Sequence, residues 1–341
     1  MISSESKGRE GDMTVADLGE FGLIAAIQER LPPDPVAIVG NGDDAAVLPA
    51  PDGRVVATTD LLVEDRHFRR GWSAAADIGA KAAAQNLADV AAMGARATGL
   101  LLGLALPGDL PVAWVLELAT GLAAECARAG AHVVGGDITS ADAVMLAITA
   151  LGDLNGASPV TRAGARPGDV IALSSPVGAS AAGLALLTAG WTSERPAADG
   201  WSAAALIAAH RRPQPDYAAG PIAAAADATS MIDVSDGLLA DLGHIAAASR
   251  VCLDVGSASL PGTAPLMAAA AELGADWRQW ALAGGEDHAL AATFPQRASV
   301  PPTWTVIGTV LEGAGILVDS ARWRGPEGWT HFRGGERKAS S

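Results

Sequence analysis

The stretch that most constrains the fold lies between residues 74 and 93, where nearly every side chain is Ala, Leu, Val, Ile or Met. As a helix, a run this apolar has to be buried nearly all round. Lys81, Gln85, Asn86 and Asp89 interrupt it at spacings that share one helix face. Burying such groups without partners costs about 1 to 3 kcal/mol each. We therefore expect this face to meet a ligand, with Lys81 neutralising phosphate and Asp89 holding metal; a polar network that caps a sheet is the structural alternative.

Runs of strand length alternate with runs of helical periodicity along the chain. This alternation predicts an α/β fold with mixed α+β sheets. Near the start we expect a helix over residues 16–31, and then a hairpin formed by residues 46–48 and 55–59 around a Pro- and Gly-containing turn. The later elements expected are helices over 74–93, 112–129, 179–189, 202–210, 217–226 and 238–249, and strands over 98–106, 131–134, 143–151, 170–174, 231–234, 251–255, 289–294 and 304–310.

A breaker-rich stretch over residues 155–169 contains several Gly and Pro residues and is typical of a domain boundary. Residues 1–15 carry hardly any apolar side chains, as a disordered tail does. We therefore expect a disordered tail over residues 1–15, an N-terminal domain over 16–155 and a C-terminal domain over 156–335.

Composition excludes several classes of protein. The chain of 341 residues is 50% hydrophobic, enough to bury a large core. Its 23 basic and 38 acidic residues give a net charge of −15, which repels a nucleic-acid backbone, so no nucleic-acid partner is expected. No apolar stretch reaches the about 18 residues of a membrane span, so we expect no membrane partner and a cytoplasmic location. Cys126 and Cys252 lie far apart in apolar surroundings and are expected to be buried free thiols.

Aspartates recur in or beside glycine-rich turns in both halves of the chain. They are Asp44, Asp60, Asp89, Asp137, Asp233 and Asp236. Oxygen ligands without Cys or His neighbours suit hard cations, and Mg²⁺ usually completes its shell with nucleotide phosphates. The pattern therefore predicts Mg-nucleotide chemistry, with acidic loops from both halves converging around the metal.

The two commonest nucleotide-binding loops do not fit this sequence. Residues 40–45 match a dinucleotide pattern with Ala in the third glycine's place, and Asp60 lies near the expected distance downstream. That site needs a helix to start at the turn, which Pro49 and Pro51 prevent, and two carboxylates would face the pyrophosphate. No Gly-x-x-x-x-Gly-Lys-Ser/Thr sequence occurs, which excludes a P-loop.

Ordinary structural roles stay open for several other candidates. Ser235 or Asp236 can be a helix N-cap. His67 can be a surface histidine, and Trp329 can be part of the core. Arg162 can be a solvated side chain, although basic residues are scarce here and its place beside the domain boundary makes it a candidate phosphate clamp.

Short motifs follow one another from Gly19 to Phe332. They are Gly19-Glu20-Phe21, Gly42-Asp43-Asp44-Ala45, Thr59-Asp60-Leu61-Leu62-Val63 with His67-Phe68, Asn86-Leu87-Ala88-Asp89, Gly135-Gly136-Asp137, Thr161-Arg162-Ala163-Gly164-Ala165, Asp233-Val234-Ser235-Asp236-Gly237 and Gly284-Gly285-Glu286-Asp287. Each motif is modest, but their number and order are specific. Together they resemble the thiamine-monophosphate kinases of the AIR synthetase-like, or PurM-like, superfamily.

The resemblance implies an enzyme that transfers the γ-phosphoryl group of ATP to thiamine phosphate, giving thiamine diphosphate. It implies several Mg²⁺ ions as cofactors and ATP as the co-substrate. It also implies a two-domain PurM-like fold, with an N-terminal α/β domain whose sheet pairs across a homodimer and a C-terminal α/β domain that closes over the nucleotide.

The same resemblance assigns roles to individual residues. Those implied as Mg²⁺ ligands are Asp44, Thr58, Thr59, Asp60, Asp89, Asp137, Asp233 and Asp236. Those implied to contact ATP are Gly136, Asp137, Arg162 and Ser235, and those implied to contact thiamine phosphate are His67, Glu286 and Trp329. No side chain is expected to act as a general base, because the attacking phosphate oxygen is already ionised near neutral pH.

At three places the chain departs from the usual motifs of this family. Asp65 stands where glycine is usual, Ile138 replaces a threonine, and His288 replaces a tyrosine. We expect these positions to touch the substrate more than the metal cluster. Two alternatives stay open: another ATP-dependent enzyme of the superfamily, such as an aminoimidazole ribonucleotide synthetase, or a catalytically silent Mg-nucleotide-binding protein.

Overall fold

The computed structural model describes residues 13–39, 45–195, 201–295 and 300–330. Its described residues fall into two compact units. The first comprises the chain up to Thr161 together with Arg211–Met231, and the second comprises Arg162–His210 and the chain from Ile232 onward. The domain bounds expected from the sequence stay a prediction; the units place Arg211–Met231 with the first half rather than the second.

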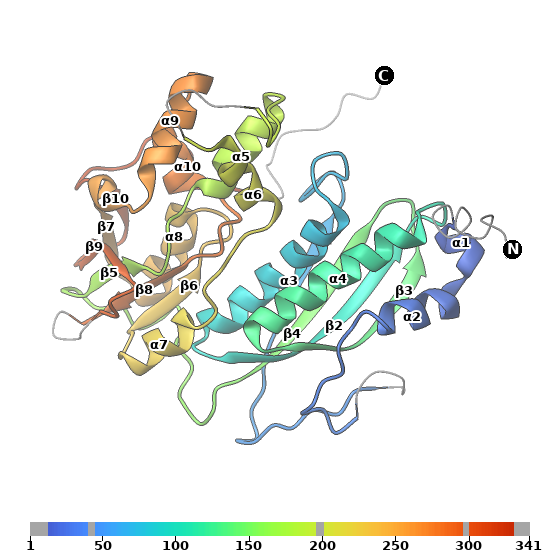
Figure 1. Cartoon of the computed structure of the whole chain (residues 1–341). Coiled ribbons are helices and arrows are strands. Elements are labelled where there is room, and N and C mark those ends of the chain that lie inside the picture. The colour runs from blue at the N-terminus through green and yellow to red at the C-terminus, as the bar shows by residue number, and fades with distance from the viewer. Residues whose placement is uncertain (1–12, 40–44, 196–200, 296–299, 331–341) are drawn as a thin grey trace, which may run out of the picture. The chain divides into compact units, whose positions relative to one another are not determined.

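A four-stranded mixed sheet forms the first unit. Its order is β1 (Val56–Val63), β4 (Met145–Asp153), β2 (Arg96–Leu106) and β3 (His132–Ser140). The pairs β1–β4 and β2–β4 are antiparallel and β2–β3 is parallel. Helices α3 (Ala75–Ala92) and α4 (Val112–Ala129) cover one face of this sheet (Figure 1).

Helix α3 is buried along nearly its whole length, as the sequence predicts. Close packing against α4 explains its small side chains. A Cβ atom on Gly79 would lie 2.0 Å from the carbonyl oxygen of Leu118, and one on Gly121 would lie 1.9 Å from that of Ala76. The two backbones therefore approach each other where only glycine fits.

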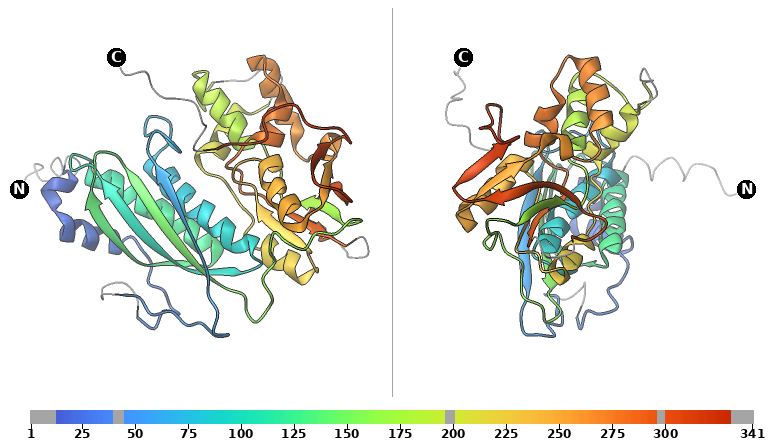
Figure 2. Two further views of the ribbon diagram at one scale, coloured as in Figure 1. Left: turned by 180° about the vertical axis from the view of Figure 1, so that it is seen from behind. Right: turned by 90° about the vertical axis from the view of Figure 1, so that its left-hand side faces the viewer.

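The opposite face of the four-stranded sheet has no helix over it in the described part of the first unit, as the view from behind shows (Figure 2). Side chains alternate across a strand, so residues two apart share a face. Leu61, Leu101 and Met145 are exposed there, on β1, β2 and β4. The first unit thus presents an apolar, water-exposed sheet face, which we call the open sheet face.

The second sheet is also mixed, which confirms the α/β class expected from the sequence. Its order is β10 (Gly315–Val318), β7 (Cys252–Val255), β9 (Thr305–Leu311), β5 (Val170–Leu173), β8 (Leu290–Phe294) and β6 (Ser230–Asp233). The helices of the second unit are α5 (Ala179–Thr188), α6 (Ala203–Arg211, whose last residue belongs to the first unit), α8 (Leu238–Ser249), α9 (Thr263–Leu273) and α10 (Trp277–Ala283). Helix α7 (Ala219–Ala225) belongs to the first unit.

Two expectations for the N-terminal region are wrong. The helix expected over residues 16–31 is two helices, α1 (Val15–Leu18) and α2 (Glu20–Gln28), because Gly19 between them has φ = 72°. The hairpin does not form: Val47 bridges to Val39, and β1 pairs with β4. Thr14 and Val15, placed in the expected tail, begin the capped helix α1.

Two further expectations can be compared with the described residues. Cys126 and Cys252 are buried and free, as predicted. None of the described helices combines the length and the apolar character needed to cross a membrane.

Candidate functional site

The polar face of α3 meets strand β1. Thr58 and Asp60 on β1 and Asp89 on α3 are predicted metal ligands. Thr58 Oγ1 donates a 2.8 Å hydrogen bond to Asp89 Oδ2. The backbone N–H of Asp60 donates to Asn86 Oδ1 at 3.0 Å, and Asn86 Nδ2 donates to the carbonyl of Ala82. Asn86 is fully buried, so it fixes the position of Asp60. The structure therefore brings the side chains of Thr58 and Asp89 into contact and fixes the backbone of Asp60 against the same helix.

The turn after β1 carries His67 and is held by Lys81. Lys81 Nζ donates to the carbonyl oxygen of His67 at 3.1 Å from a side chain that is only 2% exposed. The backbone N–H of Val63 donates to His67 Nδ1 at 3.0 Å, so in the neutral ring the proton lies on Nε2. Asp65 adopts φ = 62° in the same turn, which explains why glycine is usual there. The contact of Lys81 positions this turn, a role that sequence reasoning missed.

Asp137 does not join this group within one copy of the chain. It lies on β3 opposite Gly103, whereas Asp60 lies on β1, and strands β4 and β2 separate the two. Three interstrand spacings amount to about 14 Å, too far for one cation to contact both carboxylates. Its neighbour Ile138 packs against the core, so Asp137 points to the open sheet face.

Gly136 lies beside Asp137 where β3 passes close to β2. A Cβ atom at Gly136 would lie 2.2 Å from the carbonyl oxygen of Leu102. Thr59 also faces away from the helices, and its Oγ1 donates to the carbonyl oxygen of Ile148 at 2.9 Å. The predicted ligands of the first unit are thus divided between the two faces of the sheet.

In the second unit, Asp233 ends β6, and the turn that follows carries Ser235 and Asp236. Asp241 holds this turn: its Oδ2 accepts the N–H groups of Ser235, Asp236 and Gly237 at 3.0, 3.1 and 3.0 Å. Burial raises the pKa of Asp241 to about 7, and the negative charge of Asp233 adds to the effect. The N-cap of α8 is Gly237, so neither Ser235 nor Asp236 has the N-cap role left open by the sequence.

His288 lies against Asp233, with His288 Nδ1 3.3 Å from Asp233 Oδ2, and both side chains are buried. His288 thus lies beside a predicted metal ligand, and the expectation that this departure touches the substrate stays a prediction. His288 has φ = 54°, and its N–H donates to the carbonyl oxygen of Val234 at 2.9 Å, a placement that a sequence motif does not reveal.

The segment from Gly284 to His288 is held against the turn after β6. The N–H of Glu286 donates to the carbonyl oxygen of Ser235 at 2.8 Å, and a Cβ atom on Gly285 would lie 2.3 Å from that oxygen. Asp287 accepts hydrogen bonds from the N–H groups of Gly178 and Ser180 at the start of α5. Burial raises the pKa of Asp287 to about 6, although these two hydrogen bonds act in the opposite direction.

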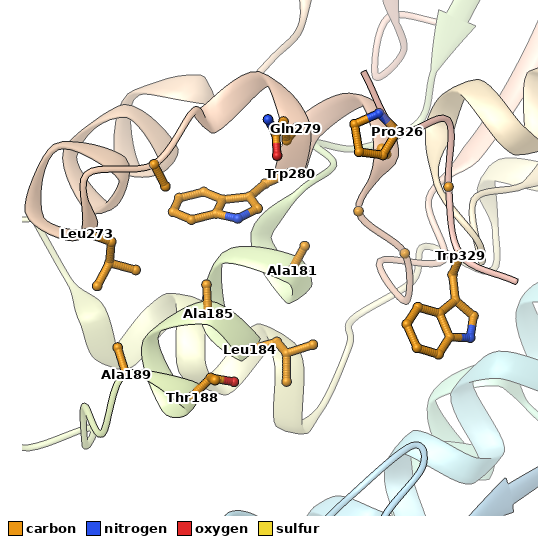
Figure 3. Close-up of a pocket in the computed structure, with 15 residues that line it drawn as sticks. Ala181, Leu184, Ala185, Thr188, Ala189, Leu273, Gln279, Trp280, Pro326 and Trp329 are labelled. Carbon is orange, nitrogen blue, oxygen red and sulfur yellow. The ribbon is translucent and has the colours of Figure 1, made fainter. Parts of the chain in front are cut away.

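An open, mostly apolar pocket of about 640 Å³ lies beside this segment, wholly within the second unit (Figure 3). Helices α5 and α10 and residues 326–329 line it. Trp280 and Trp329 are its aromatic side chains, and Trp329 is 58% exposed. The N–H of Trp329 donates to the carbonyl oxygen of Asp236, which links this wall to the acidic turn. The pocket suits a flat, partly apolar ligand.

Two predicted site residues remain, Arg162 and Asp44. Arg162 is exposed, and its carbonyl oxygen accepts a hydrogen bond from Ser249 Oγ. Asp44 lies outside the described residues. Within the described ranges, no three His, Cys, Asp or Glu side chains of one copy are placed to hold a single metal ion. No sequence pattern pointed to Asp241 or Trp280, because their roles depend on contacts between separate segments.

Comparison with known proteins identifies the family. The family model for the N-terminal domain of AIR synthase related proteins matches residues 42–154. A thiamine-monophosphate kinase from Mycobacterium tuberculosis is 46% identical over 94% of this chain and 93% of its own length. One from Aquifex aeolicus is 35% identical over 94% of this chain and 100% of its own.

Solved structures agree with these relatives. The structure of AaThiL complexed with AMPPCP and TMP matches with a TM-score of 0.76 and 34% identity, over 94% of this chain and 99% of that one. The hydrogenase maturation protein HypE in complex with ATP matches at 20% identity and a TM-score of 0.65, which shows a shared fold alone. By its relatives and its two mixed sheets, the chain belongs to the thiamine-monophosphate kinase family.

Proposed function

We propose that this protein transfers the γ-phosphoryl group of ATP to thiamine phosphate, giving thiamine diphosphate. The observation that carries the proposal is the match along 94% of the chain to a structure complexed with AMPPCP and TMP, at 34% identity. Thiamine-monophosphate kinases at 46% and 35% identity over the same share of the chain support it.

Two groups of oxygen donors would hold Mg²⁺ in this reaction. In the first unit they are Thr58, Asp60 and Asp89, and in the second they are Asp233 and Asp236. Carboxylate and hydroxyl oxygens fit a hard cation, and Thr58 keeps lone pairs for it while it donates its proton to Asp89. Asp44, Thr59 and Asp137 are proposed as further ligands. Bound Mg²⁺ would neutralise the phosphates so that two anions can approach each other.

The protein's own part in the chemistry is to bind and orient. The attacking phosphate oxygen of thiamine phosphate carries a negative charge near neutral pH, so no side chain has to remove a proton. We assign the contacts with ATP to Gly136, Asp137, Arg162 and Ser235. The close approach of β3 to β2 at Gly136 leaves backbone rather than side chain at this point, which suits contact with a phosphate.

We assign the recognition of thiamine phosphate to Glu286, Trp329 and His67. The apolar pocket beside Gly285 offers Trp329 and Trp280 as aromatic surfaces for the flat rings of thiamine. The thiazolium ring is cationic, so an aromatic face and the nearby carboxylate of Glu286 both favour it. His67 presents Nε2–H as a donor, because its Nδ1 accepts from the backbone of Val63.

A homodimer would cover the open sheet face, which carries Asp137. Leu61 is 53% exposed, and Leu101 and Met145 are each 37% exposed, on the same face as Asp137. Covering such a face with the same face of a second copy removes apolar surface from water. We propose that the open sheet faces of two copies pair, so that Asp137 and Thr59 of each copy lie at the interface between them.

An ADP-release assay tests the proposed function. It is run with purified protein, ATP and Mg²⁺ against thiamine phosphate, thiamine and aminoimidazole ribonucleotide precursors. ADP release that depends on thiamine phosphate, with thiamine diphosphate as the product, is expected. Turnover with an aminoimidazole precursor alone would favour the other enzymes of the superfamily, and nucleotide binding without turnover would favour a silent binding protein.

A further inference from the structure

A buried polar cluster behind Glu286 joins residues from three separate segments of the second unit. His210 on α6 lies with its Nδ1 3.3 Å from Ser180 Oγ on α5 and 3.6 Å from Glu286 Oε2 in the loop after α10. Ser180 is 1% exposed and His210 is 5% exposed, whereas the Glu286 side chain keeps 29% of its surface in contact with solvent. The cluster thus reaches from the interior to the partly exposed carboxylate of Glu286.

The main chain of Glu286 is already fixed. Glu286 adopts φ = 67°, a left-handed conformation that an ordinary residue keeps only when its surroundings impose it. Its N–H donates to the carbonyl of Ser235, and the next residue, Asp287, is bound by the first turn of α5. With the backbone fixed, the side-chain torsions of Glu286 set where its carboxylate lies.

The contacts of His210 suit the task of fixing those torsions. A ring nitrogen without a proton would place its lone pair opposite the carboxylate oxygen, which is unfavourable, so the proton belongs on Nδ1. That N–H then lies between Ser180 Oγ and Glu286 Oε2. Ser180 in turn restrains the ring, and its own backbone is tied to Asp287.

We propose that His210 is a positioning residue that orients the carboxylate of Glu286 toward the cationic thiamine moiety, and that Ser180 restrains His210 in that orientation. This inference rests on the proposed function, which assigns Glu286 to thiamine phosphate. A carboxylate held in place needs no ordering when the ligand binds, so loss of His210 weakens ground-state binding of thiamine phosphate.

A purely structural role for His210 makes a different prediction. Helices α5 and α6 pack so closely that a Cβ atom on Gly183 would lie 2.1 Å from the carbonyl oxygen of Leu206 and 3.0 Å from Cβ of His210. If His210 served only this packing, its replacement would lower the melting temperature and would affect both substrates alike.

Steady-state kinetics of the full chain separate the two roles. His210→Leu is expected to raise KM for thiamine phosphate about tenfold while KM for ATP changes less than about twofold. His210→Asn retains a donor near the position of Nδ1 and is expected to keep KM within about threefold of wild type. Ser180→Ala tests the same chain of contacts without a change in α6, and is expected to raise KM for thiamine phosphate about threefold. His244→Leu, at an exposed histidine on α8, is the matched control.

A double-mutant cycle with Glu286→Gln supplies the decisive measurement. If His210 acts through Glu286, then KM of the double variant is no higher than that of Glu286→Gln alone. Effects that multiply, or equal rises in both KM values with a lowered melting temperature, would overturn the inference. Wild-type turnover of thiamine phosphate with unchanged KM in His210→Leu overturns the inference alone, whereas absence of that turnover in wild type overturns the proposed function and the inference together.

Discussion

Thr58 Oγ1 donates its proton to Asp89 Oδ2 at 2.8 Å, joining strand β1 to helix α3 across 31 residues of sequence. The bond leaves the second oxygen of the carboxylate and the lone pairs of the hydroxyl for other partners. Thr58 and Asp89 therefore offer a hydroxyl oxygen and a carboxylate oxygen side by side, a pair that suits a hard cation.

Asp89→Asn is expected to lower kcat at least about tenfold, a loss of about 1.4 kcal/mol in transition-state stabilisation. The amide can still accept the hydrogen bond from Thr58, so the fold is expected to persist, but the negative charge for the cation is gone. Turnover at saturating Mg²⁺ and a circular dichroism melt measure the two effects. Asp109→Asn, at an exposed position, is the control, and equal activity of the two variants would contradict the role of Asp89.

Asn86→Leu is expected to lower the free energy of unfolding by about 1 to 3 kcal/mol, because the N–H of Asp60 loses its buried acceptor. Leucine has a similar volume, so the loss reports the hydrogen bonds rather than a cavity. Urea denaturation measures it. Gln85→Leu, at the half-buried neighbouring position on α3, should change stability by less than about 0.5 kcal/mol. A comparable loss in both variants would show that Asn86 has no special part.

Asp287 is expected to make stability fall as the pH rises from about 4 to about 6. Its pKa is raised from 3.8 to about 6 in the folded protein by burial, so in this window the folded state binds a proton that the unfolded state has released. The stabilising contribution is complete below pH 4 and is lost above pH 6, by at most about 3 kcal/mol. Asp287→Asn lacks this titration, so the variant should gain stability relative to wild type across the window. A difference in unfolding free energy that stays constant from pH 4 to pH 7 would refute the assignment.

Trp280→Ala is expected to raise KM for thiamine phosphate about tenfold, since an aromatic wall of the pocket contributes about 1 to 1.5 kcal/mol to the binding of a flat cationic ring. Trp277→Ala, on the same helix but outside the pocket lining, serves as the control. Isothermal titration with thiamine phosphate complements the kinetics. Equal affinities of the two variants would remove Trp280 from the ligand site.

Leu61→Arg is expected to convert the protein to a monomer and to abolish turnover, because charge on the open sheet face opposes its burial against a second copy. Sedimentation velocity measures the oligomeric state. Val306→Arg places the same charge on an exposed strand position of the second unit and should leave a dimer. A monomeric wild-type protein with full activity would refute the pairing of sheets.

Strong local patterns in the sequence predicted most of the fold. The apolar periodicity of residues 74–93 and 112–129 matches helices α3 and α4, and the alternation of elements indicated two mixed sheets. The prediction of a hairpin was wrong because turn residues alone do not show which strand pairs with β1. No expectation was formed for α9, α10 or β10, where the sequence signals are weak.

The residue types alone predicted which ligands the site can bind, because carboxylates near glycine-rich turns keep their charge and ligand preference in any fold. The residue types did not predict which of these carboxylates lie close together. Strand order alone places Asp137 three spacings from Asp60, and only packing brings His288 to Asp233 and His210 to Glu286. Local composition fixes what a side chain can bind, whereas its neighbours depend on contacts between residues far apart in the chain, and those contacts exist only once the sheets and helices have assembled.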